Sequence, residues 1–149
     1  MKKVFKTFLV VILLVFIAIQ FFQPALNKHS GQVYTTDFTG IHKMPANMKA
    51  LFETACYDCH SNNTNYLWFD FVQPARWLIE KHIGNAKKEL NFNEWGNYSK
   101  RKQERLLNSM AEQIETGQMP LRSYTLLHKN ARLSKEEIEI LSQWLKVQP

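Results

Sequence analysis

Two cysteines and a histidine lie within one short stretch, Cys56-Tyr57-Asp58-Cys59-His60, and the 149-residue chain has no other cysteine. A C-x-x-C-H pattern is typical of covalent haem attachment. On a helix the two thiols stand about one turn apart, which suits addition to the two vinyl groups of one porphyrin. The adjacent imidazole can then bind the iron. The pattern therefore predicts one covalent haem c held by Cys56, Cys59 and His60.

Three other uses of a C-x-x-C pair fit this chain less well. A disulfide would close a very short loop and gain little chain entropy. A thioredoxin-like redox pair would need a βαβ context, which is missing from the sequence pattern. Structural zinc usually takes four protein ligands, and no second ligand pair occurs at metal spacing.

The second axial position of a haem iron decides much of its chemistry. Met119 follows a helix-ending glycine and precedes Pro120, so it is predicted to lie on a stiffened loop from which its thioether can reach the iron. Met110 belongs to an apolar helix stripe and is predicted to be core. His82 and His128 remain alternatives, and bis-histidine ligation would lower the reduction potential.

Polar side chains for the haem propionates are also predicted. Trp77 has an indole N–H and Arg76 a guanidinium, and both are candidates for binding these carboxylates. The alternative is core packing for the tryptophan and a solvated position for the arginine.

The elements that must position these residues are predicted to be helical, because little period-2 alternation occurs after residue 45. Helices are expected over residues 45–57, from about residue 74, over residues 99–116 and from residue 134. A capping box marks the last of these, and Gly117 terminates the one before it. The predicted fold class is all-α, a cytochrome c-like helical domain wrapped round one covalent haem.

The first segment is strongly apolar. Lys2, Lys3 and Lys6 precede a charge-free run from Thr7 to Phe22. Such a run is at the short end of what can span a bilayer, and no A-x-A-like cleavage site follows it. The sequence predicts an uncleaved, single-pass transmembrane helix with its N-terminus in the cytoplasm.

The expected organisation is a membrane anchor over residues 1–26, a linker over 27–43 and the haem domain over 44–149. The formal net charge is +6, with charges interspersed and not gathered in a basic stripe. This excludes a nucleic-acid binder and fits a surface that docks another protein.

Several segments together resemble the bacterial haem-binding domain family of small c-type cytochrome-like proteins. They are ACYDCHSNNTNYLW, QPARWL, LNFNEWGNY, GQMPLRSYTLLHKNARLS and a closing helix with Trp144, and they cover residues 45–145. The attachment motif of that family corresponds to Cys56, Cys59 and His60, and its Met-Pro pair to Met119 and Pro120.

The predicted function is one-electron transfer by an electron carrier, and not conversion of a substrate. The haem domain is expected outside the cytoplasm, in the periplasm or extracytoplasmic space, close to a redox partner protein in or at the membrane. The alternative is a haem-based sensor or a peroxidase-like enzyme whose distal site is open.

Overall fold

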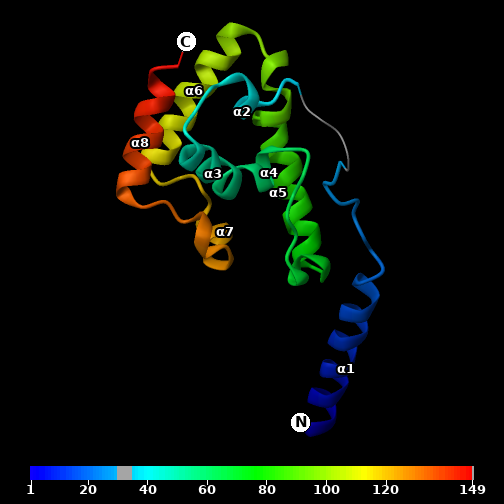
Figure 1. Cartoon of the computed structure of the whole chain (residues 1–149). Helices are drawn as coiled ribbons and strands as arrows, with labels where there is room; N and C mark the ends of the chain where they lie inside the picture. Colours follow the sequence, from blue (N-terminus) through cyan, green and yellow to red (C-terminus); the bar gives the residue numbers. More distant parts are fainter. Residues whose placement is uncertain (30–34, 149) are drawn as a thin grey trace.

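The computed structural model describes residues 1–29 and 35–148, and every regular element in them is helical (Figure 1). The all-α prediction is confirmed. In chain order the α-helices are α1 (Lys2–Ile19), α2 (Phe38–Ile41), α3 (Ala46–Ala55), α4 (Tyr57–His60), α5 (Ala75–Glu89), α6 (Lys100–Glu115), α7 (Arg122–Leu127) and α8 (Lys135–Lys146). Three short 3-10 turns are η1 (Trp68–Phe71), η2 (Phe92–Asn97) and η3 (Lys129–Ala131).

Helices α6 and α8 lie side by side and form one side of the core (Figure 1). The side chain of Ser99 caps the start of α6, and Gly117 ends it with a φ of +68°, a conformation that glycine adopts without strain. Ser134 and Glu137 form the predicted capping box at the start of α8. The buried apolar residues that these two helices contribute are Leu106, Leu107, Ala111, Ile114, Leu141 and Leu145.

An aromatic cluster fills the centre of the core. Phe38 of α2 is fully buried, with its ring 5.2 Å from Phe52, 5.1 Å from Phe92 and 4.8 Å from Trp95 between centroids. Phe38 falls in the segment predicted as a linker, 27–43. Residues 30–34 of that segment lie outside the described residues. The part from α2 onward belongs to the core, because Phe38 packs between elements of the domain.

The predicted transmembrane helix over residues 1–26 is wrong. No helix within the described residues is long and apolar enough to cross a membrane. Helix α1 has 18 residues and includes three lysines, so its charge-free part runs only from Thr7 to Ile19. At 1.5 Å per residue that part is about 20 Å long, against ~30 Å for the hydrocarbon core of a bilayer. The predicted single-pass placement in the cytoplasmic membrane, with the domain on its outer side, is contradicted by the same finding.

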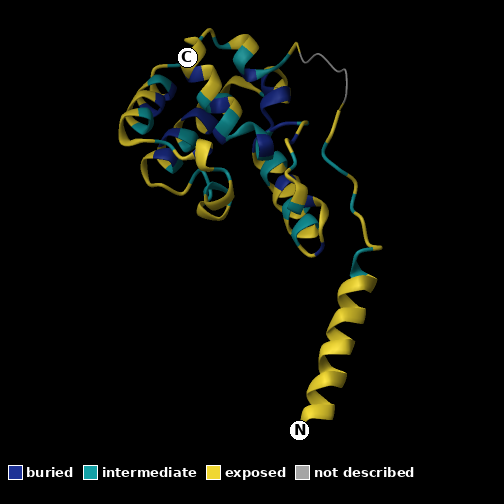
Figure 2. Ribbon diagram, turned by 60° about the horizontal axis from the view of Figure 1, so that its bottom comes forward, coloured by how far each residue is buried: buried dark blue, intermediate teal, exposed yellow. Residues whose placement is uncertain are grey.

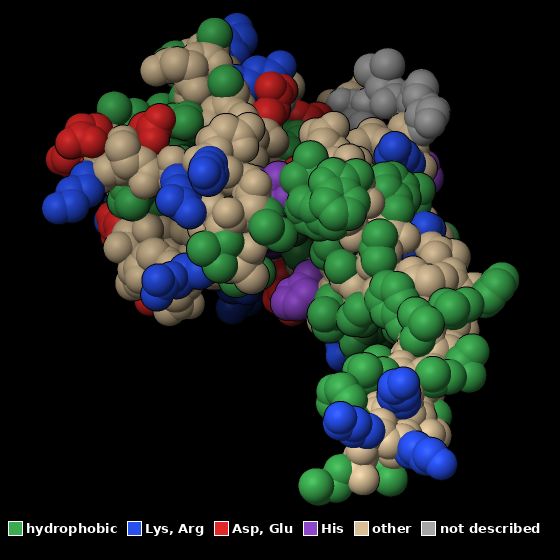
Figure 3. All heavy atoms as spheres, turned by 90° about the horizontal axis from the view of Figure 1, so that it is seen from below, with side chains coloured by type: hydrophobic (Ala, Val, Ile, Leu, Met, Phe, Trp, Pro, Cys, Tyr) green, Lys and Arg blue, Asp and Glu red, His purple; other side chains and the backbone are tan. Residues whose placement is uncertain are grey.

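Long-range polar contacts occur where α1 ends. The side chain of Gln20 donates to the carbonyl of Gln73 (3.3 Å) and accepts from its N–H (3.0 Å), and the Gln73 side chain donates to the carbonyl of Phe22. These bonds join residues 20–22 to the segment just before α5. Helix α1 itself extends from the rest of the chain with hydrophobic side chains over its surface (Figures 2 and 3).

Candidate functional site

A cavity of about 670 Å³ lies among α3, α4, α5, α6 and α7. Its lining includes the four residues predicted to hold the haem and its iron: Cys56, Cys59, His60 and Met119. Most of the rest of the wall is apolar, with Phe52, Phe92, Leu106 and Ile114 among the buried residues that contribute. The volume is that of a small-molecule or cofactor site.

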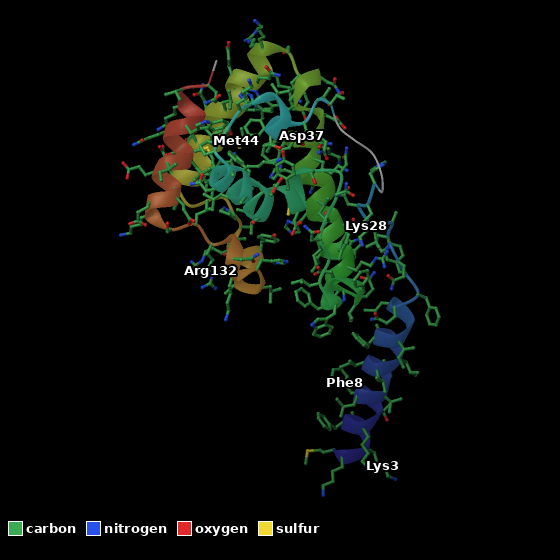
Figure 4. The ribbon with its side chains drawn as sticks, viewed as in Figure 1. Lys3, Phe8, Lys28, Asp37, Met44 and Arg132 are labelled. Carbon is green, nitrogen blue, oxygen red and sulfur yellow. The ribbon has the colours of Figure 1, made fainter. Side chains whose placement is uncertain are left out.

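The two residues between the cysteines are tied into the protein away from the cavity. Tyr57 donates to both carboxylate oxygens of Asp37 (3.0 and 3.1 Å), which lies at the start of α2 (Figure 4). Its ring also stacks on Phe92 at 4.9 Å between centroids. The carboxylate of Asp58 accepts from the backbone and side-chain nitrogens of Asn65, each at 3.0 Å. Because both residues are held, α4 is fixed in rotation with its cysteines and its histidine toward the cavity.

The imidazole of His60 is oriented by a backbone carbonyl. Its Nδ1 lies 3.0 Å from the carbonyl oxygen of Leu90, which can only accept, so Nδ1 carries the proton and Nε2 keeps its lone pair. Burial lowers the pKa of His60, which favours the neutral form. A neutral imidazole with Nδ1–H bonded to a carbonyl is the usual form of a histidine that binds a metal through Nε2.

Both cysteines are free thiols. Burial raises the pKa of Cys56 to about 12, with a further contribution from Cys59, and the pKa of Cys59 to about 11, with a further contribution from Asp58. The thiols are therefore protonated at neutral pH, unlike a thioredoxin-like pair, which needs a lowered pKa. The described residues also contain no group of three or more His, Cys, Asp or Glu able to hold a metal ion, which disfavours the zinc alternative.

Met119 reaches the cavity from the loop that follows α6. Its backbone N–H donates to the carbonyl of Gln113 (3.1 Å) just after the turn at Gly117. Two of its competitors share the lining: Met110, which also packs against the core from α6, and His82, which is exposed on α5.

The other competing histidine lies elsewhere. His128 stacks on Tyr124 at 4.0 Å between centroids and is not part of the lining.

The two residues predicted to bind propionates lie outside the lining. Arg76 donates to the carbonyl of Pro24 through two guanidinium nitrogens. Trp77 is 43% exposed, and the Lys81 ammonium lies 5.0 Å from the centroid of its ring. Both residues belong to the first turn of α5, whereas the part of α5 that lines the cavity begins at His82.

Two cations that the sequence reasoning did not select do line the cavity. Lys88 reaches it from the last turn of α5, and Arg105 from α6. Neither takes part in an ion pair among the described residues. Arg105, Ser109 and Gln113 follow one another at a spacing of four residues, so this polar stripe beside the apolar face of α6 was a signal available in the sequence.

Comparison with known families shows what kind of domain this is. Residues 14–147 match the model of the haem-binding domain family. The chain belongs to this family. No curated protein and no solved structure matches it.

The cavity of this haem-binding domain fits a haem by the chemistry of its walls. A porphyrin needs apolar surfaces to pack on, and the iron needs at least one neutral donor such as the Nε2 atom of His60. Two free thiols, two thioethers and two cations without an ion pair among the described residues share the same cavity. The residues present are therefore compatible with the cofactor that the family binds.

Proposed function

We propose that this domain binds one haem covalently through Cys56 and Cys59, with His60 and Met119 as the axial iron ligands, and that it carries single electrons. The observation that carries this proposal is the meeting of all four side chains in one cavity, with the His60 imidazole already held by the Leu90 carbonyl. Bound haem would supply an iron that alternates between Fe(II) and Fe(III).

The thiols have the form that covalent attachment requires. If haem binds here, each S–H would add across one vinyl group, with sulfur bonding to one carbon and hydrogen to the other, so no oxidant or leaving group would be involved. Cys56 and Cys59 are separated by a turn of α4, and both are held at the cavity by the anchored residues between them. Covalent attachment also suits a domain with a core this small, because the cofactor cannot dissociate.

The case for Met119 as the second ligand is based on its backbone. A loop methionine fixed by the Gln113 carbonyl can turn its thioether into the cavity without disturbing a helix. Met110 is engaged in core packing, and His82 lies on an exposed face of α5. A His/Met pair would keep the iron six-coordinate in both oxidation states and raise the reduction potential relative to bis-histidine ligation.

The two cations of the lining suit the two propionates. Lys88 and Arg105 outnumber Glu89, the acidic residue of the lining, and neither has an ion-pair partner among the described residues. Carboxylates are complementary to both side chains, and a guanidinium can bind one through two parallel hydrogen bonds.

The test is to express the chain with a haem-maturation system and record spectra of the oxidised and reduced protein. We expect a low-spin reduced spectrum that is lost in Met119→Ala and kept in Met110→Leu, a matched change in the same cavity. We also expect carbon monoxide to bind reduced Met119→Ala readily and the reduced wild type poorly. An unchanged Met119→Ala spectrum would move the second ligand to His82, and ready carbon monoxide binding by the wild type would favour the sensor or peroxidase-like alternative.

A further inference from the structure

One tyrosine hydroxyl joins the segment that carries Met119 to the cysteine motif. The Oη atom of Tyr124, in the first half of α7, donates to Oδ2 of Asp58 at 2.7 Å and lies 3.3 Å from the carbonyl oxygen of Thr54. Asp58 is only 7% exposed, and its other oxygen is occupied by two bonds from Asn65. The carboxylate is therefore a fixed acceptor at the centre of the motif.

Apart from the tyrosine bond, helix α7 is kept in place by its contacts with η3 and by the bond from the Arg132 guanidinium to the carbonyl of Thr125. It contains no buried residue, and Leu126 and Leu127 are 66% and 59% exposed, so burial of apolar surface contributes little to its position. Its exposed surface is visible next to the better-buried core helices (Figure 2). Within this helix, Tyr124 is the residue whose side chain both lines the cavity and bonds to α4.

The loop bearing Met119 is thus held at both ends. At one end, the N–H groups of Gln118 and Met119 donate to the carbonyl of Gln113 at the close of α6. At the other, the N–H of Tyr124 donates to the carbonyl of Leu121, and the tyrosine side chain bonds to the motif. Without the tyrosine bond, the downstream side of the loop would keep its backbone bonds and the contacts of α7 with η3, but no side-chain link to the cysteine motif.

We propose that Tyr124 is a positioning residue whose hydrogen bond to Asp58 holds the Met119 loop over the cavity and keeps the thioether on the iron. This inference rests on the proposed function. A thioether is a weak, uncharged donor, so the fraction of time that it is bound depends on how firmly the protein holds its loop. Losing a hydrogen bond to a charged group shifts such an equilibrium by about tenfold or more. The contact therefore decides whether the second iron site is closed or open to small molecules.

The experiment compares Tyr124→Phe with Tyr66→Phe in the full-length, haem-loaded protein. Tyr66 is a matched control because its hydroxyl bonds to Glu80 (2.5 Å) and to the N–H of Asn27 (2.7 Å), and it is not part of the cavity lining. The readouts are intact mass, the long-wavelength absorption band of methionine-bound Fe(III), and the rate at which carbon monoxide binds the reduced protein. Met119→Ala gives the upper limit for an open site.

We expect all of these proteins to carry the same added haem mass. Tyr124→Phe should bind carbon monoxide about tenfold faster than the wild type and show a weaker methionine band, while Tyr66→Phe should match the wild type. An unchanged rate and band in Tyr124→Phe, or an equal change in both tyrosine variants, would overturn the positioning role. Failure of the proposed function is recognised separately, because Met119→Ala would then resemble the wild type or the wild type would carry no haem.

Discussion

Replacing Phe38 with alanine tests whether α2 is an integral part of the domain that forms the haem cavity. The side chain is fully buried, and its ring lies within 6.0 Å, between centroids, of five other aromatic rings. Truncation of a buried phenylalanine costs about 3–5 kcal/mol. We expect the upper half of this range, because the packed rings on all sides cannot collapse into the space without losing their edge-on contacts.

The assay is urea unfolding of the haem-loaded, full-length protein, followed by circular dichroism. Since small domains are stable by about 5–15 kcal/mol, Phe38→Ala could lose most of its folded population, so Phe38→Leu is included with an expected loss of roughly 1–2 kcal/mol. Phe22→Ala is the control, because its side chain is 61% exposed and its removal should change the free energy of unfolding by less than about 0.5 kcal/mol. A loss below ~1 kcal/mol for Phe38→Ala would refute the reasoning and leave α2 as a peripheral segment.

Three further outcomes are expected. Burial lowers the pKa of His42, so the unfolded chain takes up a proton more readily than the folded one. The free energy of unfolding should therefore fall as the pH drops below about 6.5. This fall should be smaller in His42→Gln, as measured by urea unfolding at pH 7 and pH 5. Ser134→Ala removes the cap of α8 and should cost about 1 kcal/mol in the same assay, and no loss would show that the capping bond is not stabilising. Replacing both Lys88 and Arg105 with glutamine should lower the reduction potential measurably but by no more than about 40 mV, which corresponds to ~1 kcal/mol for one electron at an exposed site. An unchanged potential would contradict their role beside the propionates.

The parts of the molecule that were predictable depend on local sequence. A capping box, a terminating glycine and an apolar stripe act within one or two helical turns, so both ends of α6 and the start of α8 could be derived before the fold was known. The cysteine motif is equally local. Its residues are brought to a single cavity with Met119 because α4 is only one turn long and is held by both residues inside the motif.

The parts that were missed depend on contacts between distant segments. The residue after the end of α1, Gln20, bonds to Gln73, which lies 53 residues away, and no pattern in the apolar run reports that contact. Phe38 stands in a polar stretch with only a four-residue helix around it, so its burial could not be derived from periodicity. The part of α5 that lines the cavity depends on how α5 packs on α4, and the sequence pattern around Arg76 does not report that contact.

Intact-mass analysis of denatured protein from a host that matures c-type cytochromes tests the central proposal most directly. The wild type is predicted to carry the added mass of one haem, and the Cys56→Ala, Cys59→Ala double variant is predicted to have the mass of the bare chain. A wild-type chain without the added mass, from cells in which a control cytochrome is fully matured, would contradict covalent attachment at this cavity.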